Sequence, residues 1–225
     1  MIGIIVAMEE EIQFLLSKMC IEAEQNYKTL HFYIGKIAQK DIVVVKSGIG
    51  KVNAALATTL LIKEFAPSYI INTGSSAGLH PQMNIADIAI SARTFHHDFD
   101  LTPIGFSKGE IPGLPIYFDA DEKILKHIHE KYLSENIFIG DIASGDHFVT
   151  SESYVKELKS NNPNLIAIDM EAVAIAQVCY FFDCPYIVVR SISDVPGKEE
   201  QHISFDKFVQ LAGAKSAEFA LQILL

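Results

Sequence analysis

The sequence predicts an α/β protein, a single-domain three-layer sandwich in which helices flank a central, twisted sheet that is mixed but largely parallel. The chain has 225 residues, of which 49% are hydrophobic, enough to bury a large core. Several short segments are continuous apolar runs, which is typical of parallel strands covered on both faces. They alternate with segments that have helical spacing. We therefore expect residues 1–225 to form one domain.

Strands are expected where short apolar runs rich in β-branched residues occur. Residues 2–7 (IGIIVA) form the first run, and residues 31–37 and 41–46 are expected to pair as two neighbouring strands. The remaining runs of this kind lie at residues 69–72, 87–94, 137–143, 165–168 and 186–192.

Helices are expected between these strands. The first begins at three consecutive glutamates, residues 9–11, because acidic side chains stabilise a helix N-terminus. Behind them Ile12, Leu15 and Met19 recur with helical spacing. The other helical segments are residues 52–65, 121–133, 151–159, 170–182 and 204–224.

Three connecting segments have unusual compositions. Residues 47–50 (SGIG) and 73–78 (TGSSAG) are expected to be glycine-rich loops. Neither has the Lys-Ser/Thr ending of a P-loop or the glycine spacing of a dinucleotide-binding fold, so we reject a phosphate-binding interpretation. Residues 96–118 form a long irregular segment that contains three prolines. A loop of this length usually covers a site or contacts a partner.

The composition excludes several classes of partner. With 28 acidic and 18 basic residues the formal net charge is −10, which argues against binding to nucleic acid. The chain has two arginines, Arg93 and Arg190, which is few for a site that clamps free phosphate. No segment is expected to span a membrane or to act as a signal peptide. The three cysteines form an odd set without metal-ligand spacing, so we expect a cytoplasmic protein.

Three carboxylates follow predicted strands at the edge of the sheet where ligands of such folds bind: Glu11, Glu171 and Asp194. A lone aspartate at a strand end more often caps a turn, and acidic residues favour the first turn of any helix. Position alone therefore does not choose among the three N-terminal glutamates. Glu171 differs, because the helix after it is almost wholly apolar. A buried carboxylate is costly unless it has a partner or a ligand.

Eight motifs follow one another along the chain: AMEEEI (7–12), SGIGKVNAAL (47–56), INTGSSAG (71–78), HHDFDLT (96–102), SGDHF (144–148), DMEAVAIAQVC (169–179), VVRSISD (188–194) and SFDKF (204–208). In this order the chain resembles, over essentially its whole length, the bacterial 5′-methylthioadenosine/S-adenosylhomocysteine nucleosidases of the purine nucleoside phosphorylase superfamily. The resemblance implies one nucleoside phosphorylase-like catalytic domain over residues 1–225. It also implies a homodimer without metal or cofactor.

The resemblance further implies an activity. The enzyme would hydrolyse the N-glycosidic bond of 5′-methylthioadenosine and S-adenosylhomocysteine, and of 5′-deoxyadenosine, to adenine and the corresponding sugar. This reaction belongs to methionine salvage and S-adenosylmethionine recycling. Asp194 matches the acid that protonates the leaving adenine, for which burial must raise its pKa. Glu11 matches the residue that activates water, and Glu171 the one that binds the ribose hydroxyls.

Other site residues are also implied by the resemblance. Phe148 matches the aromatic side chain that stacks on the purine, and Met170 the side chain under the ribose. The remaining substrate-binding positions are Met8, Ser75, Ala77, Gly78, Val149, Ser193 and Phe205. The positions expected to reach the substrate pocket of the neighbouring subunit are Leu101, Ile104 and Pro112.

Some positions depart from the family's pattern. The second glycine-rich segment has GSSAG where GSAGG is common, so Ser76 and Ala77 occupy positions that are usually smaller or more flexible. Asp169 stands where many members have glutamate, and residues 195–200 contain an unusual proline. From its residue type and position, Asp169 is also a candidate N-cap of the helix that follows it. These departures leave the substrate preference open.

Two further features and three alternatives remain. His96, His97, Asp98 and Asp100 suggest a metal site but lack a clear third anchor at ligand spacing, so we expect no metal. Arg190 lies in an apolar strand and needs a carboxylate partner.

The alternative functions are a phosphorylase on the same fold, a hydrolase of another nucleoside such as a deoxyadenosine or a futalosine-type substrate, and a nucleoside-binding protein without turnover.

Overall fold

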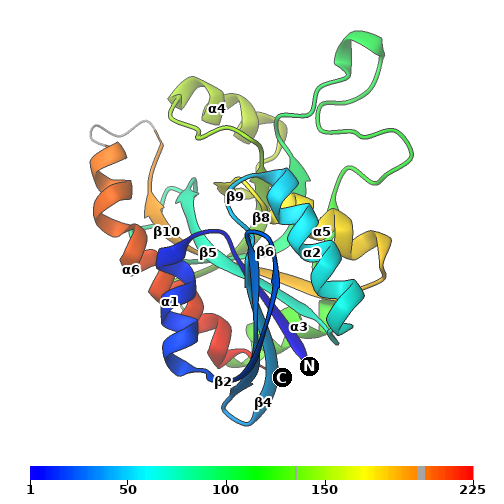
Figure 1. Cartoon of the computed structure of the whole chain (residues 1–225). Coiled ribbons are helices and arrows are strands. Elements are labelled where there is room, and N and C mark those ends of the chain that lie inside the picture. The colour runs from blue at the N-terminus through cyan, green and yellow to red at the C-terminus, as the bar shows by residue number, and fades with distance from the viewer. Residues whose placement is uncertain (135, 197–200, 225) are drawn as a thin grey trace.

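The computed structural model describes residues 1–134, 136–196 and 201–224, with the side chains of 201–204 and 206 excepted (Figure 1). The strands in this part of the chain are β1 (Ile2–Val6), β2 (Cys20–Tyr27), β3 (Leu30–Ile37), β4 (Lys40–Lys46), β5 (Ile70–Gly78), β6 (Ile88–His96), β7 (Phe118–Asp119), β8 (Ile137–Ser144), β9 (Leu165–Asp169) and β10 (Tyr186–Asp194). The helices are α1 (Glu9–Lys18), α2 (Lys51–Phe65), the 3-10 helix η1 (Thr102–Ile104), α3 (Glu122–Lys131), α4 (Glu152–Asn161), α5 (Ala172–Phe181) and α6 (Gln201–Gln222).

These strands form one mixed sheet that partly closes on itself. Its order is β10-β6-β8-β9-β5-β1-β4-β3-β2, with β7 paired to β6. Since β10 also pairs with β5, the strands β10, β6, β8, β9 and β5 make a closed ring, and the others extend from it. Parallel pairs join β1 to β4 and β5, β5 to β10, and β8 to β6 and β9. The antiparallel pairs lie in the β2–β3–β4 meander, at β7 and where the ring closes.

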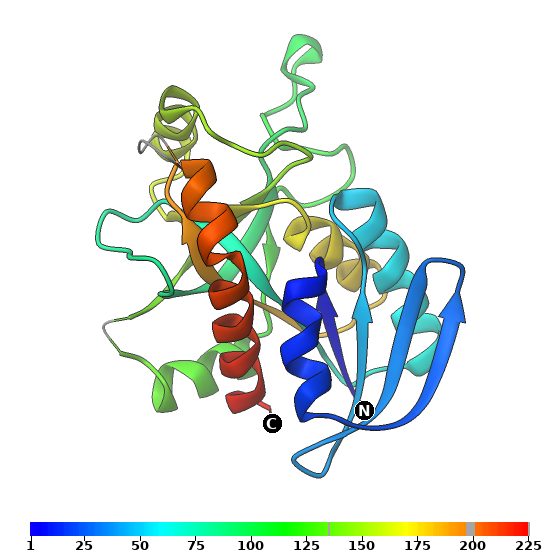
Figure 2. The same cartoon turned by 60° about the vertical axis from the view of Figure 1, so that its left-hand side comes forward.

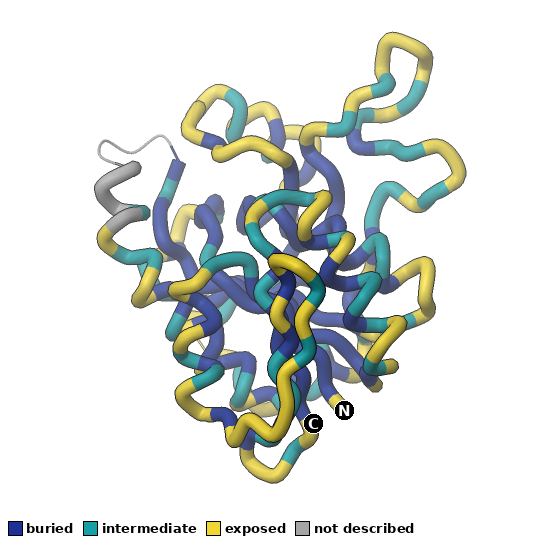
Figure 3. The backbone as a smooth tube through the Cα atoms, viewed as in Figure 1, coloured by how far each residue is buried: buried dark blue, intermediate teal, exposed yellow. Residues whose placement is uncertain are grey.

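Helices cover both faces of the sheet, which gives the predicted layers. Helices α2 and α5 pack together over one face, and the apolar side chains of α2, α5 and the strands form a common core. On the other side α1 lies along α6, and α3 joins them around a second core (Figures 1 and 2). Most strands are buried between these layers, whereas β2, the outer helix faces and the loops are largely exposed (Figure 3). Among the described residues, no helix combines the length and apolarity that a membrane span requires.

The predicted α/β class is confirmed, but the glycine-rich loop expected at residues 73–78 is wrong. These residues continue β5 to Gly78. Residues 73–77 pair in parallel with β10, and Gly78 pairs with β9 in the antiparallel direction. Their small side chains permit a close approach rather than a turn. A Cβ at Gly74 would lie 2.7 Å from Glu11 Oε1, and one at Gly78 would lie 2.9 Å from Ile192 Cγ2. Glycine here marks close packing across a strand.

Strand β2 has no counterpart among the predicted elements. Its sequence, CIEAEQNY, is largely exposed and lacks the alternation of apolar and polar residues that indicates a half-buried strand. It forms because β3, whose apolar residues are anchored in the core, offers an open edge for an antiparallel partner. The ring closure through β5 and β10 likewise depends on pairing between segments far apart in the sequence.

Candidate active site

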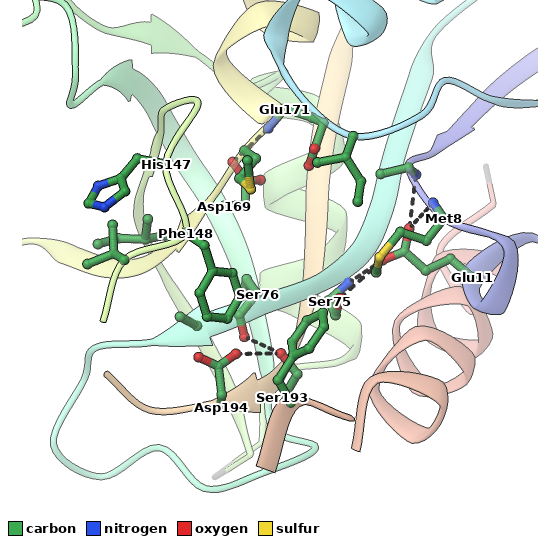
Figure 4. A pocket seen from close by; sticks show the side chains of 17 residues that line it. Met8, Glu11, Ser75, Ser76, His147, Phe148, Asp169, Glu171, Ser193 and Asp194 are labelled. Carbon is green, nitrogen blue, oxygen red and sulfur yellow. Dashed lines mark hydrogen bonds between the residues drawn. The ribbon is translucent and has the colours of Figure 1, made fainter. Parts of the chain in front are cut away.

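A cavity of about 350 Å³ lies at the ends of β1, β5, β9 and β10. Figure 4 shows carboxyl groups approaching it from three sides, with aromatic and aliphatic side chains between them. The residues that line it are Ala7, Met8, Glu11, Ile49, Ser75, Ser76, Ala77, His147, Phe148, Val149, Ile168, Asp169, Met170, Glu171, Ser193, Asp194 and Phe205. None of these described lining residues is a lysine or an arginine. The described part of the lining therefore combines carboxylates with an apolar wall and contains no lysine or arginine that could clamp an anion.

Glu11 lies in the first turn of α1 and reaches back over the start of the helix. Its Oε2 accepts hydrogen bonds from the backbone N–H groups of Ala7 (2.9 Å) and Met8 (3.1 Å). Its Oε1 accepts from the backbone N–H of Ser75 at 2.9 Å and from the Ser75 hydroxyl at 3.1 Å. The residue is 2% exposed. Four donors thus fix this carboxylate between α1 and β5, where the absence of a side chain at Gly74 leaves room for it.

The other two glutamates of this turn do not line the cavity. Glu9 is exposed and pairs with Lys46 and Gln13, and Glu10 is exposed as well. Successive side chains point in different directions around a helix, so only one of three consecutive residues faces a given neighbour. The structure therefore distinguishes the three glutamates that position in the sequence could not.

Asp194 is the last residue of β10 and is 1% exposed. The hydroxyl of Ser193 lies 2.7 Å from Asp194 Oδ1 and 3.2 Å from the carbonyl oxygen of Ser76, so it can donate to either. In a regular strand Ser193 and Asp194 would point to opposite faces. A register irregularity between Ile192 and Asp194 in the pairing with β5 brings both residues to the cavity wall.

Glu171 precedes α5 and is 7% exposed. Its Oε1 accepts a hydrogen bond from the backbone N–H of Gly50 at 2.8 Å. Burial raises the pKa of Glu171 to about 8, and the negative charge of Asp169 adds to the increase. Its other oxygen, Oε2, has no hydrogen-bond partner among the described residues. The sequence predicted that this buried carboxylate needs a partner or a ligand. Among the described residues, the protein supplies a hydrogen bond to one of its two oxygens.

Asp169 is the centre of a buried network behind the cavity. Its Oδ1 accepts from the Ser144 hydroxyl (2.5 Å) and from the backbone N–H groups of Glu171 (3.3 Å) and Ala172 (3.2 Å) at the turn into α5. The N-cap position of α5 is Glu171, so the assignment of Asp169 as N-cap lies two residues too early. Its Oδ2 accepts from Arg190 Nε at 2.9 Å. Arg190 also donates to Asn72 Oδ1 at 2.5 Å. This carboxylate is the partner that Arg190 needed, and it joins β5, β9 and β10 at the base of the site.

The apolar walls come from several separate elements. The rings of Phe148 and Phe205 meet edge to face, with centroids 5.3 Å apart. Phe148 is 37% exposed at the mouth of the cavity, whereas Val149 beside it is buried. Met8 and Met170 are half-buried and line the cavity after β1 and β9. An aromatic side chain exposed beside a cavity can stack on a flat ligand.

Four predicted site residues do not line the cavity of this chain. Gly78 lies in β5 and makes room for Ile192 instead. Leu101, Ile104 and Pro112 lie on the irregular segment that projects from the body of the molecule (Figure 1). Ile104 is 70% exposed. None of these three side chains lines the cavity of its own chain.

Several cavity residues were not predicted as site residues. They are Ala7, Ile49, Ser76, His147, Ile168 and Asp169. Each lies in or beside a segment that follows the carboxyl end of a strand, and this position was the available signal. The side chains carry no distinctive chemistry apart from His147 and Asp169. A residue that follows a strand end but has an unreactive side chain cannot be assigned to the cavity wall from the sequence, because ordinary loops contain the same residue types.

The departures from the family's pattern fall at three places in the chain. Ser76 and Ala77 both line the cavity, and the Ser76 hydroxyl is buried without a hydrogen-bond partner among the described residues. Asp169 fills the position behind Glu171, where it meets Arg190. Of the proline-containing stretch 195–200, residues 197–200 lie outside the described part of the chain.

The histidine cluster that suggested a metal site makes other contacts. His97 Nδ1 lies 3.0 Å from the Tyr154 hydroxyl, and burial lowers the pKa of His97 to about 4. Asp98 forms an ion pair with Lys51 and accepts from the backbone N–H of Asp146. Within the described residues, no group of three or more His, Cys, Asp or Glu side chains is arranged to hold a metal ion.

Comparison with known proteins gives a family for this geometry. The family model described as the phosphorylase superfamily matches residues 1–225. A 5′-methylthioadenosine/S-adenosylhomocysteine nucleosidase of Bacillus pumilus is 42% identical over 226 residues, with 99% of this chain and 97% of that protein covered. The Bacillus subtilis protein of the same name is 40% identical over 227 residues, with the same coverage.

Solved structures show the same likeness. The nucleosidase of Neisseria meningitidis in complex with methylthio-immucillin-A has a TM-score of 0.93 and 37% identity, with 99% of this chain and 97% of that chain covered. The futalosine hydrolase of Helicobacter pylori has a TM-score of 0.91 and 32% identity, with 99% and 96% covered. Sequence and structure agree over the full length, and the chain belongs to the 5′-methylthioadenosine/S-adenosylhomocysteine nucleosidases of the phosphorylase superfamily.

Proposed function

We propose that this protein hydrolyses the N-glycosidic bond of 5′-methylthioadenosine and S-adenosylhomocysteine, and also of 5′-deoxyadenosine, releasing adenine in methionine salvage and S-adenosylmethionine recycling. The observation that carries the proposal is the arrangement of Glu11, Glu171 and Asp194. They come from α1, the start of α5 and the end of β10, and they surround one largely apolar cavity. Such a site suits a flat base, a sugar that becomes cationic, and a water molecule.

Asp194 is the general acid in this proposal. Adenine is a poor leaving group as an anion, and a carboxylic acid that protonates it at N7 removes that barrier. Asp194 is almost completely buried at the strand end, which disfavours its charged form. Ser193 donates a hydrogen bond to its Oδ1, which helps to fix the orientation of the carboxyl group toward the base.

Glu11 is the base that activates water. The transition state has oxocarbenium character, so a nearby carboxylate both stabilises the sugar and takes a proton from the attacking water. The donors from Ala7, Met8 and Ser75 fix the orientation of Glu11. Ser75 lies beside the same carboxylate and can also contact the sugar or the water.

Glu171 binds the ribose hydroxyls. Its Oε2 lacks a hydrogen-bond partner among the described residues, and two adjacent hydroxyl donors would supply one. Met170 lies under the sugar, and Phe148 stacks on the purine. The remaining contacts to the base, sugar and 5′ substituent come from Met8, Ala77, Val149, Ser193 and Phe205, which all line the cavity.

Hydrolysis is favoured over phosphorolysis by the lining of the cavity. A phosphate nucleophile needs cationic donors, and the described lining contains no lysine or arginine. The buried Arg190 lies four residues before Asp194, but its guanidinium group already donates hydrogen bonds to Asp169 and Asn72. Glu11, which acts as a carboxylate base in this proposal, would also repel an anionic nucleophile.

The test is incubation with 5′-methylthioadenosine in phosphate-free buffer, followed by detection of free adenine. We expect adenine release at the same rate with and without phosphate; strict dependence on phosphate would replace hydrolysis by phosphorolysis. A parallel assay with S-adenosylhomocysteine, 5′-deoxyadenosine and futalosine ranks the substrates. The futalosine arm is included because a futalosine hydrolase shares this fold at 32% identity. Cleavage of futalosine alone would overturn the substrate assignment.

We also propose a homodimer in which the projecting segment of one chain completes the cavity of the other. Ile49, Val52 and Leu56 form an exposed apolar stripe at helical spacing at the start of α2, and they are 53%, 79% and 53% exposed. Ile49 also lines the cavity, so the stripe continues from its mouth. A partner's Leu101 and Ile104, together with Pro112, are apolar and fit such a surface.

Two further expectations belong to the proposal. Residues 1–225 act as one catalytic domain, because the cavity takes residues from both ends of the chain, from Ala7 to Phe205. The protein works in the cytoplasm, which is supported by three cysteines that form no disulfide. Chelators are expected to leave activity unchanged, since the proposed reaction uses carboxylates alone.

A further inference from the structure

Two of the three cysteines meet at the C-terminal end of α5, outside the cavity. Cys179 is in the last turn of the helix, and Cys184 lies in the short connection from α5 to β10. The Cys184 N–H donates to the Cys179 carbonyl at 2.9 Å, and the Asp183 N–H donates to the Tyr180 carbonyl at 3.4 Å. Asp183 has a φ of 49°. These bonds and the left-handed residue define a Schellman motif, in which the first and last side chains come into contact.

The two thiols lie beside one another. Both cysteines are free, and both line one cavity. Interaction between the two side chains lowers the pKa of Cys184 and raises that of Cys179. Cys179 is fully buried, whereas Cys184 is half-buried. Cys184 Sγ is held at the surface by the carbonyl oxygens of Pro185 (3.7 Å) and Pro67 (3.9 Å).

A second cavity gives access to the pair. It has a volume of about 280 Å³ and is lined by both cysteines. Three aspartates also line it: Asp119, Asp121 and Asp183. Their negative charge repels anionic reagents such as glutathione disulfide, while a small uncharged oxidant can enter.

We propose that Cys179 and Cys184 form an oxidation site, a dithiol that a small neutral hydroperoxide converts into an intramolecular disulfide. The Cys184 thiolate attacks one peroxide oxygen, the O–O bond breaks, and water leaves after protonation, so that Cys184 becomes a sulfenic acid. The Cys179 sulfur then attacks the Cys184 sulfur, the S–O bond breaks, and a second water leaves with the Cys179 proton. Two thiols are oxidised and one hydrogen peroxide is reduced to two waters.

The fold allows this bond without unfolding of α5. A disulfide needs its two Cα atoms within about 7 Å and its Cβ atoms facing each other. The Schellman hydrogen bonds already hold the two positions together while the helix is intact. Thiols in a reducing compartment are returned to the reduced state, so the bond is transient and reversible. Cys20 is exposed in β2 and provides an internal comparison.

The experiment treats the folded full chain of a Cys20→Ser variant with hydrogen peroxide. After acid quenching and denaturation, thiol titration and intact mass are measured. We expect both remaining thiols to be lost together, a mass lower by two hydrogen atoms, no covalent dimer, and full recovery with dithiothreitol. Circular dichroism before and after oxidation should show unchanged helix content.

Two further variants, each with one more cysteine replaced in the Cys20→Ser background, separate the roles of the two sulfurs. In Cys20→Ser/Cys179→Ser, Cys184 should accumulate as a sulfenic acid that dimedone traps. In Cys20→Ser/Cys184→Ser, the buried Cys179 should remain a thiol at the same peroxide concentration. Retention of both thiols in the Cys20→Ser variant, or disulfides between chains only, would overturn the proposal. So would a disulfide that forms only after the helix signal is lost.

Discussion

The three carboxylates of the cavity differ in what holds them. Among the described residues, Glu11 accepts four hydrogen bonds from the protein, whereas Glu171 accepts one, from the backbone of Gly50. Asp194 accepts from the neighbouring hydroxyl of Ser193. A group that the protein has already saturated is suited to a fixed role, such as orienting water. A group that keeps an oxygen without a partner, as Glu171 does among the described residues, is suited to receiving donors from a ligand.

The first prediction concerns the charge of Glu171 in the ligand-free protein. Its pKa is raised from 4.5 to about 8, so between these values the unfolded chain loses a proton that the folded chain keeps. Its contribution to the free energy of unfolding is complete below pH 4.5 and is lost as pH rises toward about 8. Glu171→Gln should flatten this decline in urea unfolding measured from pH 5 to 9. The exposed Glu10→Gln serves as control, and equal slopes in all three proteins would contradict the raised pKa.

The second prediction concerns the acid and the base. Asp194→Asn and Glu11→Gln keep the shape of each side chain but remove its proton transfer, so each should lower the rate of adenine release by at least about 100-fold. The folded structure should be retained, as judged by circular dichroism. Glu10→Gln is the matched control for Glu11→Gln, because Glu10 is its exposed neighbour. Wild-type turnover in either site variant would remove that residue from the mechanism.

The third prediction concerns the hydrogen bond that orients Asp194. Ser193→Ala removes the donor to Asp194 Oδ1, and the loss of one hydrogen bond to an ionisable group corresponds to about 10- to 100-fold in turnover. Ser191→Ala is the control, because Ser191 lies on the same strand and its buried hydroxyl has no hydrogen-bond partner among the described residues. We expect kcat to fall in the first variant alone. Equal effects of the two substitutions would show a packing defect instead.

At the scale of residues, the sequence identifies the side chains that need a partner, but it does not identify the partners. The cost of burying a carboxylate at the start of an apolar helix is enough to single out Glu171, but its partner, Gly50, is distant in the sequence. Arg190 was expected to need a carboxylate, but Asp169 could not be identified as that partner. Such pairings depend on which strands become neighbours, and local patterns do not contain this information.

At the scale of elements, β5 is the feature that builds the site. It extends to Gly78, beyond the predicted strand at 69–72, and presents Ser75, Ser76 and Ala77 to the cavity. Glycine and small polar residues favour a loop when only the local sequence is considered. In the structure they allow α1 and β10 to approach the strand closely. Apolar periodicity therefore predicted the existence and order of most elements but not the end of this strand.

The fourth prediction tests the close approach of β5 and α1. In Gly74→Ala the added Cβ would lie 2.7 Å from Glu11 Oε1, so the substitution should destabilise the protein by about 1–3 kcal/mol, as overpacking typically does. In a Glu11→Ala background the same substitution should cost much less, because the colliding carboxylate is absent. Urea unfolding of the four proteins measures this difference. Equal costs in both backgrounds would show that the strain arises elsewhere.

At the scale of the whole molecule, the closed ring of strands gathers distant parts of the chain around one cavity. Because β5 pairs with β10 as well as with β1 and β9, the ends of β5, β9 and β10 lie close together. An α/β class follows from the alternation of apolar runs and helical segments. The ring closure does not, since it requires contacts that no local pattern specifies. The same topology leaves the cavity mouth beside the exposed stripe on α2.

The last prediction concerns this exposed mouth. If a second copy covers it, Leu56→Asp places a charge in the apolar contact and should convert dimers into monomers, as sedimentation at micromolar concentration would show. Turnover should fall with it, and the loss should be larger for substrates with a 5′ substituent, because the partner's projecting segment no longer completes that end of the cavity. Lys63→Asp, near the other end of the same helix, is the control and should leave both quantities unchanged. A wild-type monomer with full activity would refute the dimer, while hydrolysis by the chain's own carboxylates would stand, since Glu11, Glu171 and Asp194 all come from one chain.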